Sequence, residues 1–311
     1  MSVYDIALKF TLQEGVIAQG KGFLKQMCII CKPKAGATAG KYLITSEQEL
    51  TAQTDNTSGL AIFRGGLSNF YLITTDDITT VGSLLVEGEN DFYTAVVTED
   101  FTDAEKVTVE DINFKGNVFT ITSDVAVAEA FIQGYDKRGV YISIDSKALL
   151  FSLSSIFNTT VGINYNDGQY LNQGADGIGG VDNDGVAENY FNKRLSFGYS
   201  DKTAGNLLAG LFVGKKAFSY RYVYKSLEID LQNAGLNYIA VQRPKNTKAG
   251  RHQIKVIFRP IFNNYINNSL IGSNYILNIS GSNENFIVDG AIELVVVEPI
   301  WKFAILTKVS N

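Results

Sequence analysis

The residues that could carry out chemistry are few, and the two cysteines come first among them. Cys28 and Cys31 form the motif CIIC, whose spacing occurs in redox pairs and in metal sites. A redox pair needs a helix N-terminus to lower a thiol pKa, whereas Pro33 follows at once here and the flanking residues favour a strand. A zinc site needs two further ligands, and the only histidine, His252, is far away in the sequence. We therefore predict two buried thiols on opposite faces of a strand.

A long segment rich in Gly, Asn and Asp, NYNDGQYLNQGADGIGGVDNDG, contains two further motifs. In VDNDG, the residues Asp182, Asp184 and Gly185 are arranged as in part of a calcium loop. The EF-hand register would then place Gly180 and Phe191 at ligand positions, which neither can fill. Asx-rich turns explain the same residues. GADGIGG has no strand before it and no helix after it to place its glycines around a pyrophosphate. We predict a loop that holds no metal and no cofactor.

The remaining sequence offers no recognisable catalytic constellation. A single histidine leaves little for a His-based triad, and no serine lies in a G-x-S-x-G elbow. Asp and Glu total 32, but nothing marks out two of them as an acid–base pair. We expect a protein that is not an enzyme, with no catalytic, cofactor-binding or metal-binding residues. An enzyme of unrecognised type is the less favoured alternative.

Residues 243–255 form a basic segment, and two interpretations of it stay open. Its cations are Arg243, Lys245, Lys248, Arg251 and Lys255. The segment is either a solvated hairpin loop or a patch that faces an acidic partner, where charge would set register and association rate. No aromatic residues alternate with the cations, which argues against single-stranded nucleic acid.

Length and composition indicate the class of the protein. A chain of 311 residues is long enough for a sizeable core and for two domains. Its 45% hydrophobic and 19% charged residues are typical of a soluble globular protein. The net charge of -5 gives no reason to expect nucleic acid or an anionic membrane as a partner. The start resembles no signal peptide, and no apolar run approaches the roughly 20 residues of a membrane helix. We expect folding in a reducing cytoplasm.

Strand and helix patterns alternate through the first half of the chain. Strands are predicted at 22–33, 69–75, 91–98, 117–123 and 139–145, and helices at 45–54, 100–114, 124–135 and 146–158. The first helix has Ser46 near its cap and Glu49 three residues later, which is the capping-box spacing. Such alternation favours an α/β layer with some parallel pairing.

The second half is predicted to be richer in strands. Helical spacing occurs at 186–199 and 201–214, and strands are predicted at 217–231, 236–242, 252–258, 275–280 and 291–297. The predicted fold class is mixed α/β (α+β), with a strand-rich body, a layered α/β domain and extended β-strand arms at both ends.

The arms are the best-specified feature of the sequence, because both alternate with the period of a strand. The apolar positions of the N-terminal arm are Val3, Ile6, Leu8, Phe10 and Leu12, and the C-terminal arm contains Ile300, Trp301, Phe303, Ile305, Thr307 and Val309. Unpaired strand edges recruit other chains, and a terminal strand can add to a neighbour's sheet. Such head-to-tail contacts propagate into rings or helices. We predict that each arm pairs with other copies of the chain.

Four stretches resemble the contractile tail sheath proteins of bacteriophages. LAIFRGGLSNFYLITT is similar to a sheath segment in which a small-residue break precedes a strand. NDFYTAVVTEDFTDAEKV resembles the strand and following helix of the central α/β part of that family. AGNLLAGLFVGKKAFSYRYVYKSLEID resembles a run in which a small-residue helix leads through a turn into an aromatic-rich strand. GAIELVVVEPIWKFAILTKV resembles the last domain strand and the C-terminal arm.

The resemblance implies a structural subunit of a contractile tail sheath. Such a subunit polymerises as stacked rings or a helical tube around an inner tail tube, through β-strand arm exchange, and contracts to drive the tube through the host envelope. The implied partners are copies of itself, the inner tail tube protein, and baseplate and tail terminator proteins, without nucleic acid or membrane insertion. The basic segment 243–255 would then face an acidic inner tube or a neighbouring subunit. The implied location is the virion tail, after assembly in the host cytoplasm.

The same resemblance implies a division into arms and body. The N-terminal arm is 1–14, the sheath body is 15–298 and the C-terminal arm is 299–311. The body comprises a first α/β part (15–160), the loop rich in Gly, Asn and Asp (161–190) and a second part (191–298). The alternative function is a receptor- or glycan-binding virion protein that uses loops such as 164–190.

Overall fold

The computed structural model describes residues 6–13, 20–88, 91–107, 114–132, 138–158, 181, 183–201, 205–210, 212–213, 216–242, 247–281 and 287–296. The chain forms two compact units. The terminal unit consists of Met1–Gly22 and Ser219–Glu298, and the central unit contains Phe23–Phe218. This division differs from the predicted arms and body, because the start of the chain belongs with its second half.

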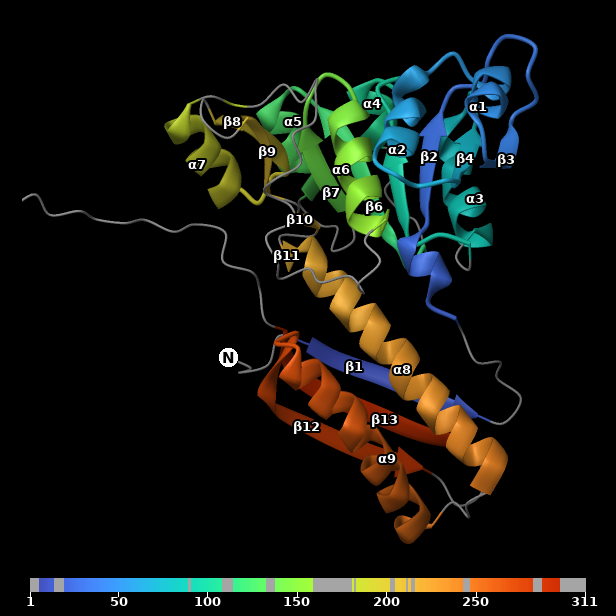
Figure 1. The fold of residues 1–311 in the computed structure, drawn as a ribbon, viewed down its shortest axis with the longest axis vertical. Helices are drawn as coiled ribbons and strands as arrows, with labels where there is room; N and C mark the ends of the chain where they lie inside the picture. Colours follow the sequence, from blue (N-terminus) through green and yellow to red (C-terminus); the bar gives the residue numbers. More distant parts are fainter. Residues whose placement is uncertain are drawn as a thin grey trace, which may run out of the picture. The chain divides into compact units, whose positions relative to one another are not determined.

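A six-stranded sheet with the strand order β3-β4-β2-β5-β6-β7 forms the centre of the central unit (Figure 1). Its strands are β2 (Met27–Cys31), β3 (Gly40–Ile44), β4 (Phe70–Thr74), β5 (Thr94–Val97), β6 (Asn117–Thr122) and β7 (Arg138–Ile142). Neighbouring strands are parallel except β3 and β4. Strands β2, β5 and β6 are buried along their whole length, as parallel strands covered on both faces should be. The predicted parallel α/β layer is confirmed.

Helices cover both faces of this sheet. They are α1 (Glu47–Gln53), α2 (Leu60–Arg64), α3 (Val81–Glu87), α4 (Asp103–Val107), α5 (Val125–Ile132) and α6 (Lys147–Asn158), with short 3-10 turns at Gly22–Lys25, Thr57–Gly59 and Ile78–Thr80. Successive side chains of a strand point to opposite faces, so β2 contributes to two cores. Cys28 and Ile30 pack with α3, whereas Ile29 approaches Gly59 and Leu50 on the other side.

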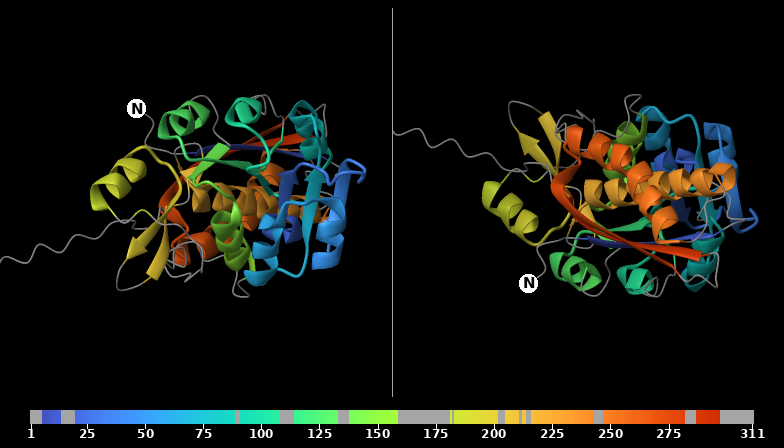
Figure 2. Two further views of the ribbon diagram at one scale, coloured as in Figure 1. Left: turned by 90° about the horizontal axis from the view of Figure 1, so that it is seen from above. Right: turned by 90° about the horizontal axis from the view of Figure 1, so that it is seen from below.

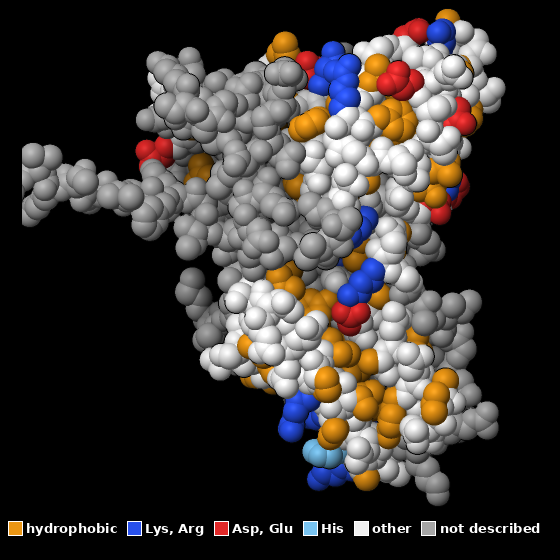
Figure 3. Space-filling view, viewed as in Figure 1, with side chains coloured by type: hydrophobic (Ala, Val, Ile, Leu, Met, Phe, Trp, Pro, Cys, Tyr) orange, Lys and Arg blue, Asp and Glu red, His pale blue; other side chains and the backbone are white. Residues whose placement is uncertain are grey.

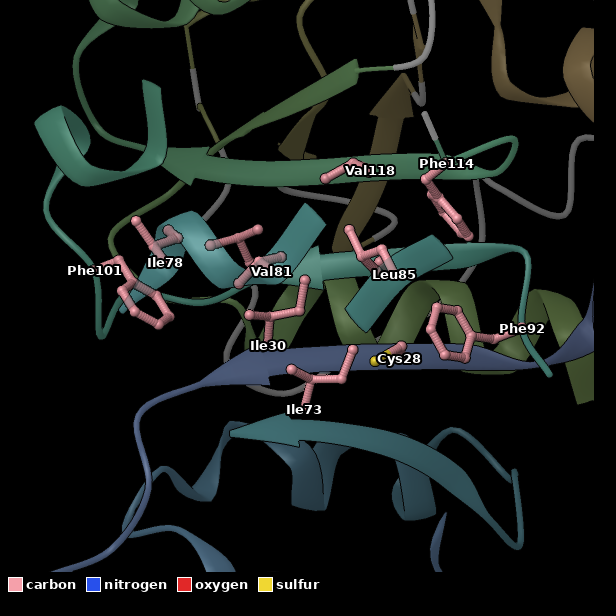
Figure 4. Close-up of a cluster of buried hydrophobic side chains, with 12 residues drawn as sticks. Cys28, Ile30, Ile73, Ile78, Val81, Leu85, Phe92, Phe101, Phe114 and Val118 are labelled. Carbon is pink, nitrogen blue, oxygen red and sulfur yellow. The ribbon is translucent and has the colours of Figure 1, made fainter. Parts of the chain in front are cut away.

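The core beneath α3 joins side chains from four neighbouring strands of the sheet to that helix (Figure 4). Its buried members are Cys28, Ile30, Ile73, Ile78, Val81, Leu85, Phe92, Ala95, Val97, Phe101, Phe114 and Val118. Burying a side chain of this size contributes about 1.5–3 kcal/mol each relative to leaving it exposed. This core is therefore a main source of stability for the central unit.

Helix α1 begins as its sequence predicts. The Ser46 hydroxyl caps the helix by accepting a hydrogen bond from the Glu49 backbone N–H at 3.3 Å. The Glu49 carboxylate reaches back to the Thr45 backbone N–H at 2.7 Å. That hydrogen bond, the largest cause, lowers the pKa of Glu49. The two contacts satisfy donors that a helix N-terminus otherwise leaves free.

The rest of the central unit consists of α7 (Asp184–Asn192), β8 (Phe197–Asp201), β9 (Gly205–Gly210), β10 (Phe212–Val213) and β11 (Lys216–Ala217). β8 pairs with β9 and β10 with β11, both antiparallel. The predicted helix at 201–214 is therefore wrong. Its Gly and Ala residues have helical spacing, but glycine is a poor helix former, and the segment pairs with β8 instead.

The terminal unit combines an antiparallel sheet with two long helices. Its elements are β1 (Ile6–Gln13), α8 (Phe218–Gln242), α9 (Lys248–Asn267), β12 (Ile271–Gly281) and β13 (Ile287–Val296), and α8 begins at the last residue of the central unit. The strand order is β1-β13-β12. Both helices lie on one side of this sheet (Figures 1 and 2).

The strands predicted at 217–231, 236–242 and 252–258 are helical, and the packing explains the difference. In α8 the buried residues Val223, Leu227 and Leu231 recur every fourth position. In α9 the buried residues are Ile254, Phe258, Phe262 and Tyr265. This spacing is typical of one face of a helix. It can be recognised only when the whole length of each helix is considered, whereas the strands were predicted from shorter stretches of sequence.

β1 lies within the segment predicted as the N-terminal arm, and in this structure it pairs with a strand of its own chain. β1 pairs antiparallel with β13, with Ile6 opposite Leu294 and Leu12 opposite Val288. The prediction assigned this pairing to other copies, whereas β13 offers a ladder of matching length within its own unit. Val3 and every named position of the C-terminal arm (Ile300, Trp301, Phe303, Ile305, Thr307 and Val309) lie outside the described residues.

Candidate functional site

The topology of the central sheet indicates one place where a ligand could bind. The parallel strands have the order β4-β2-β5-β6-β7, so the winding reverses direction between β2 and β5. In open α/β sheets, ligands bind outside the carboxyl ends of the strands at such a switch point. Lys32 follows β2 directly, and Glu99 and Asp100 follow β5. A carboxylate pair at this position was not predicted from the sequence, although it comes just after a buried apolar strand.

All four oxygens of these two carboxylates already accept hydrogen bonds from the protein. The Asp100 oxygens accept from the Lys32 backbone N–H at 3.0 Å and from the Asn56 amide at 2.9 Å. The Glu99 oxygens accept from the Ser58 hydroxyl at 2.6 Å and from the Ser146 backbone N–H at 3.1 Å. The pair thus ties the loop after α1 and the start of α6 to β5. Its arrangement serves the fold, because no oxygen is left without a protein donor.

The cysteines are buried thiols, as predicted. Both have 0% exposure and neither forms a disulfide. Cys28 lies in the core beneath α3, and the Cys31 thiol lies 3.4 Å from the hydroxyl of Thr54, which follows α1 on the opposite face. Burial raises the pKa of Cys28 and raises that of Cys31 to about 12. Neutral, inaccessible thiols are poor nucleophiles and poor metal ligands.

The VDNDG motif forms the beginning of a helix. Asn183 caps α7, and its side-chain oxygen accepts from the backbone N–H groups of Gly185 at 2.9 Å and Val186 at 3.2 Å. This is the Asx turn that the sequence indicates. Across the described part of the chain, no three His, Cys, Asp or Glu side chains come together as a possible metal site. GADGIGG and Asp182 lie outside that part.

The basic segment leads into α9 and is not a hairpin. Lys248, Arg251 and Lys255 lie in its first half, and Arg259 continues the series. The spacings of three, four and four residues place these cations along one face of the helix. Basic side chains and a histidine gather at one end of the terminal unit (Figure 3). Arg243 and Lys245 lie outside the described residues.

The terminal unit has a second ordered feature, the packing of α9 on the sheet. Tyr275 of β12 stacks on Phe262 of α9 with ring centroids 4.2 Å apart. The backbone register aligns Tyr275 with Leu294 of β13, and Leu294 with Ile6 of β1. Ile6, Leu294 and Tyr275 therefore stand in one row across the three strands.

Within the described residues, the same sheet has two edges on which no further strand lies. β1 and β12 are its outermost strands. On β12, Asn274, Ile276 and Asn278 are exposed, and Ile276 retains 40% of its surface. An edge strand presents unpaired backbone groups to which a further strand can add. Among the described helices, none is both long and apolar enough to cross a membrane.

Comparison with known proteins finds likeness in the fold. No family model matches the sequence, and no curated protein matches it. The fold is similar to that of a chain in the cryo-EM structure of the anti-feeding prophage (AFP) baseplate, 6-fold symmetrised, with a TM-score of 0.67 over 95% of both chains. The two sequences are 11% identical, so the likeness is one of fold.

Proposed function

We propose that this chain is a structural subunit of a contractile, tail-like particle and acts by assembly with other subunits rather than by catalysis. The observation that carries the proposal is the fold likeness to a chain of the AFP baseplate, because it covers 95% of both chains. The chain would thus belong to a symmetric, multi-protein assembly. The filled switch point supports a role without chemistry, since Glu99 and Asp100 are committed to holding the fold.

Within that class, we propose the role of a tail sheath subunit. Such a subunit forms stacked rings or a helical tube around the inner tail tube, and contraction drives the tube through the host envelope. Baseplate and tail terminator proteins would bind the two ends of the tube. The sequence stretches that resemble sheath proteins support this role, and so does the sheet of the terminal unit, whose outermost described strands, β1 and β12, could each accept a further strand.

Strand addition at those edges would link the copies. Main-chain pairing supplies the affinity of such a contact, and the alternating side chains set its register. Subunits joined in this way can turn against one another while the strands stay paired. Contraction would then change the contacts between the bodies of the subunits without releasing any subunit.

The test is the assembly state of the purified, full-length chain. Negative-stain microscopy and sedimentation velocity should reveal tubes or stacked rings that grow with protein concentration. Closed single rings that never extend into tubes would favour a baseplate role over a sheath role. A monomer or closed trimer at all concentrations would contradict both roles, and glycan affinity of such a species would favour the receptor-binding alternative.

A further inference from the structure

The connection between β1 and the central unit makes a polar contact with both helices of the terminal unit. Lys21 follows β1 in the sequence, and its Nζ lies 2.6 Å from Asp230 Oδ2 on α8. The same oxygen accepts a hydrogen bond from the hydroxyl of Tyr265 on α9 at 2.8 Å. One carboxylate thus joins the connection to α8 and α9.

Tyr265 holds this carboxylate in place. Its side chain is 4% exposed, and its hydroxyl lies 2.7 Å from that of Ser226, one helical turn before Asp230. Burial is the largest cause that raises the pKa of Tyr265, and the Asp230 carboxylate raises it further. The hydroxyl therefore keeps its proton and donates to Asp230, which leaves Ser226 to donate to Tyr265.

Lys21 is the member of this cluster that can leave at small cost. Its side chain is 41% exposed and that of Asp230 is 30% exposed. If the ion pair opens, water can reach both groups, and Asp230 keeps the hydrogen bond from Tyr265. No buried charge is left unpaired, in contrast to a pair in a dry core.

We infer that the Lys21–Asp230 ion pair is a latch that holds β1 on β13 of its own chain, and that opening it lets β1 pair with β13 of a second copy. The inference rests on the strand exchange in the proposed function. Among the described strands β1 pairs with β13 alone, so this ladder is the backbone pairing that has to break. Because the second copy offers the same register, the exchanged ladder replaces every pair that was lost.

The exchange can be measured with cysteines at paired backbone positions. Thr11 and Asp289 are opposite each other in the β1–β13 ladder. Full-length copies with Thr11→Cys or Asp289→Cys, carrying tags of different size, are mixed and oxidised. A disulfide between them forms only where β1 of one copy lies on β13 of the other, since Cys28 and Cys31 are inaccessible. We expect Lys21→Met to raise the heterodimer yield by up to about fivefold, which is the effect that the loss of a partly exposed ion pair allows.

Two controls separate the latch from a general loss of stability. Lys34→Met removes an ion pair of 3.4 Å with Asp55 in the central unit and should leave the yield unchanged. Lys21→Arg keeps the charge and should keep the yield low. Equal yields for Lys21→Met and Lys34→Met, or no heterodimer in any background, would overturn the latch. If the yield responds to Lys21 but neither tubes nor rings form, the latch stands and the proposed function fails.

Discussion

The rings of Phe262 and Tyr275 stack with centroids 4.2 Å apart and planes inclined by 16°, and this pair joins α9 to β12. Phe262 is fully buried. We expect Phe262→Ala to lower the free energy of unfolding by about 3–5 kcal/mol. Tyr275→Leu keeps an apolar side chain and should lose only the ring pairing, about 0.5–1.5 kcal/mol. Urea denaturation followed by circular dichroism measures both changes.

The matched control for this pair is Asn263→Ala, at an exposed position of the same helix. Its effect should stay within about 0.5 kcal/mol. If Phe262→Ala were no more destabilising than Asn263→Ala, this result would contradict the packing of α9 on β12 through Phe262.

At the switch point, Glu99→Gln should destabilise the central unit. The glutamine amide group cannot accept from both the Ser58 hydroxyl and the Ser146 backbone N–H, which Glu99 now does. A buried donor left without an acceptor costs about 1–3 kcal/mol. Thermal unfolding measures the loss, with the exposed Glu87→Gln as the control. A variant as stable as the control would show that this carboxylate is free for another role.

The buried thiols predict a pH dependence of stability. The pKa of Cys31 is raised to about 12 in the folded chain, against about 8.5 for an ordinary thiol. The unfolded chain therefore loses the proton first as the pH rises. The contribution of the protonated Cys31 thiol to the free energy of unfolding is therefore complete below about pH 8.5 and is lost progressively towards pH 12. In Cys31→Ala the free energy of unfolding should fall less steeply with pH in this window. If its slope against pH is the same as in the wild type, the thiol is not buried as described.

Five of the six strands of the central sheet could be predicted because they are short runs rich in apolar residues, whereas β3 (Gly40–Ile44) was not predicted. The 94–97 and 117–122 runs are buried along their full length, so burial leaves no alternation to misread. Helix α8 was harder to predict from the sequence. Aromatic and polar residues alternate through FSYRYVYK, and only the later positions Leu227 and Leu231 disclose the helical period.

The candidate sites depended on contacts that the sequence does not display. Glu99 and Asp100 are visible as neighbours, but Asn56 comes to them only through the crossover connection. Lys21 and Asp230 are 209 residues apart in the chain. Sequence patterns predict the structure of a single helix or strand, whereas these contacts join residues of different elements that only the tertiary fold brings together.

The basic stripe of α9 should matter for assembly rather than for folding. Replacement of Lys248, Arg251 and Lys255 by Glu reverses three charges on one helix face. We expect the variant to fold and to assemble more weakly, because a complementary acidic surface would now repel it, and we expect salt to strengthen its assembly where salt weakens that of the wild type. Light scattering across a salt series measures this. Identical curves for variant and wild type would show that this helix face takes no part in assembly.

The central claim is that copies of this chain are joined by strands from its ends, and truncation tests it most directly. Residues 300–311 alternate as a strand in the sequence, and pairing could bury several of their apolar side chains, at about 1.5–3 kcal/mol each. Negative-stain microscopy should therefore show tubes for the full chain and none for a chain that ends at Pro299, while circular dichroism shows that the truncated chain is folded. Tubes of normal appearance from the truncated chain would contradict the account.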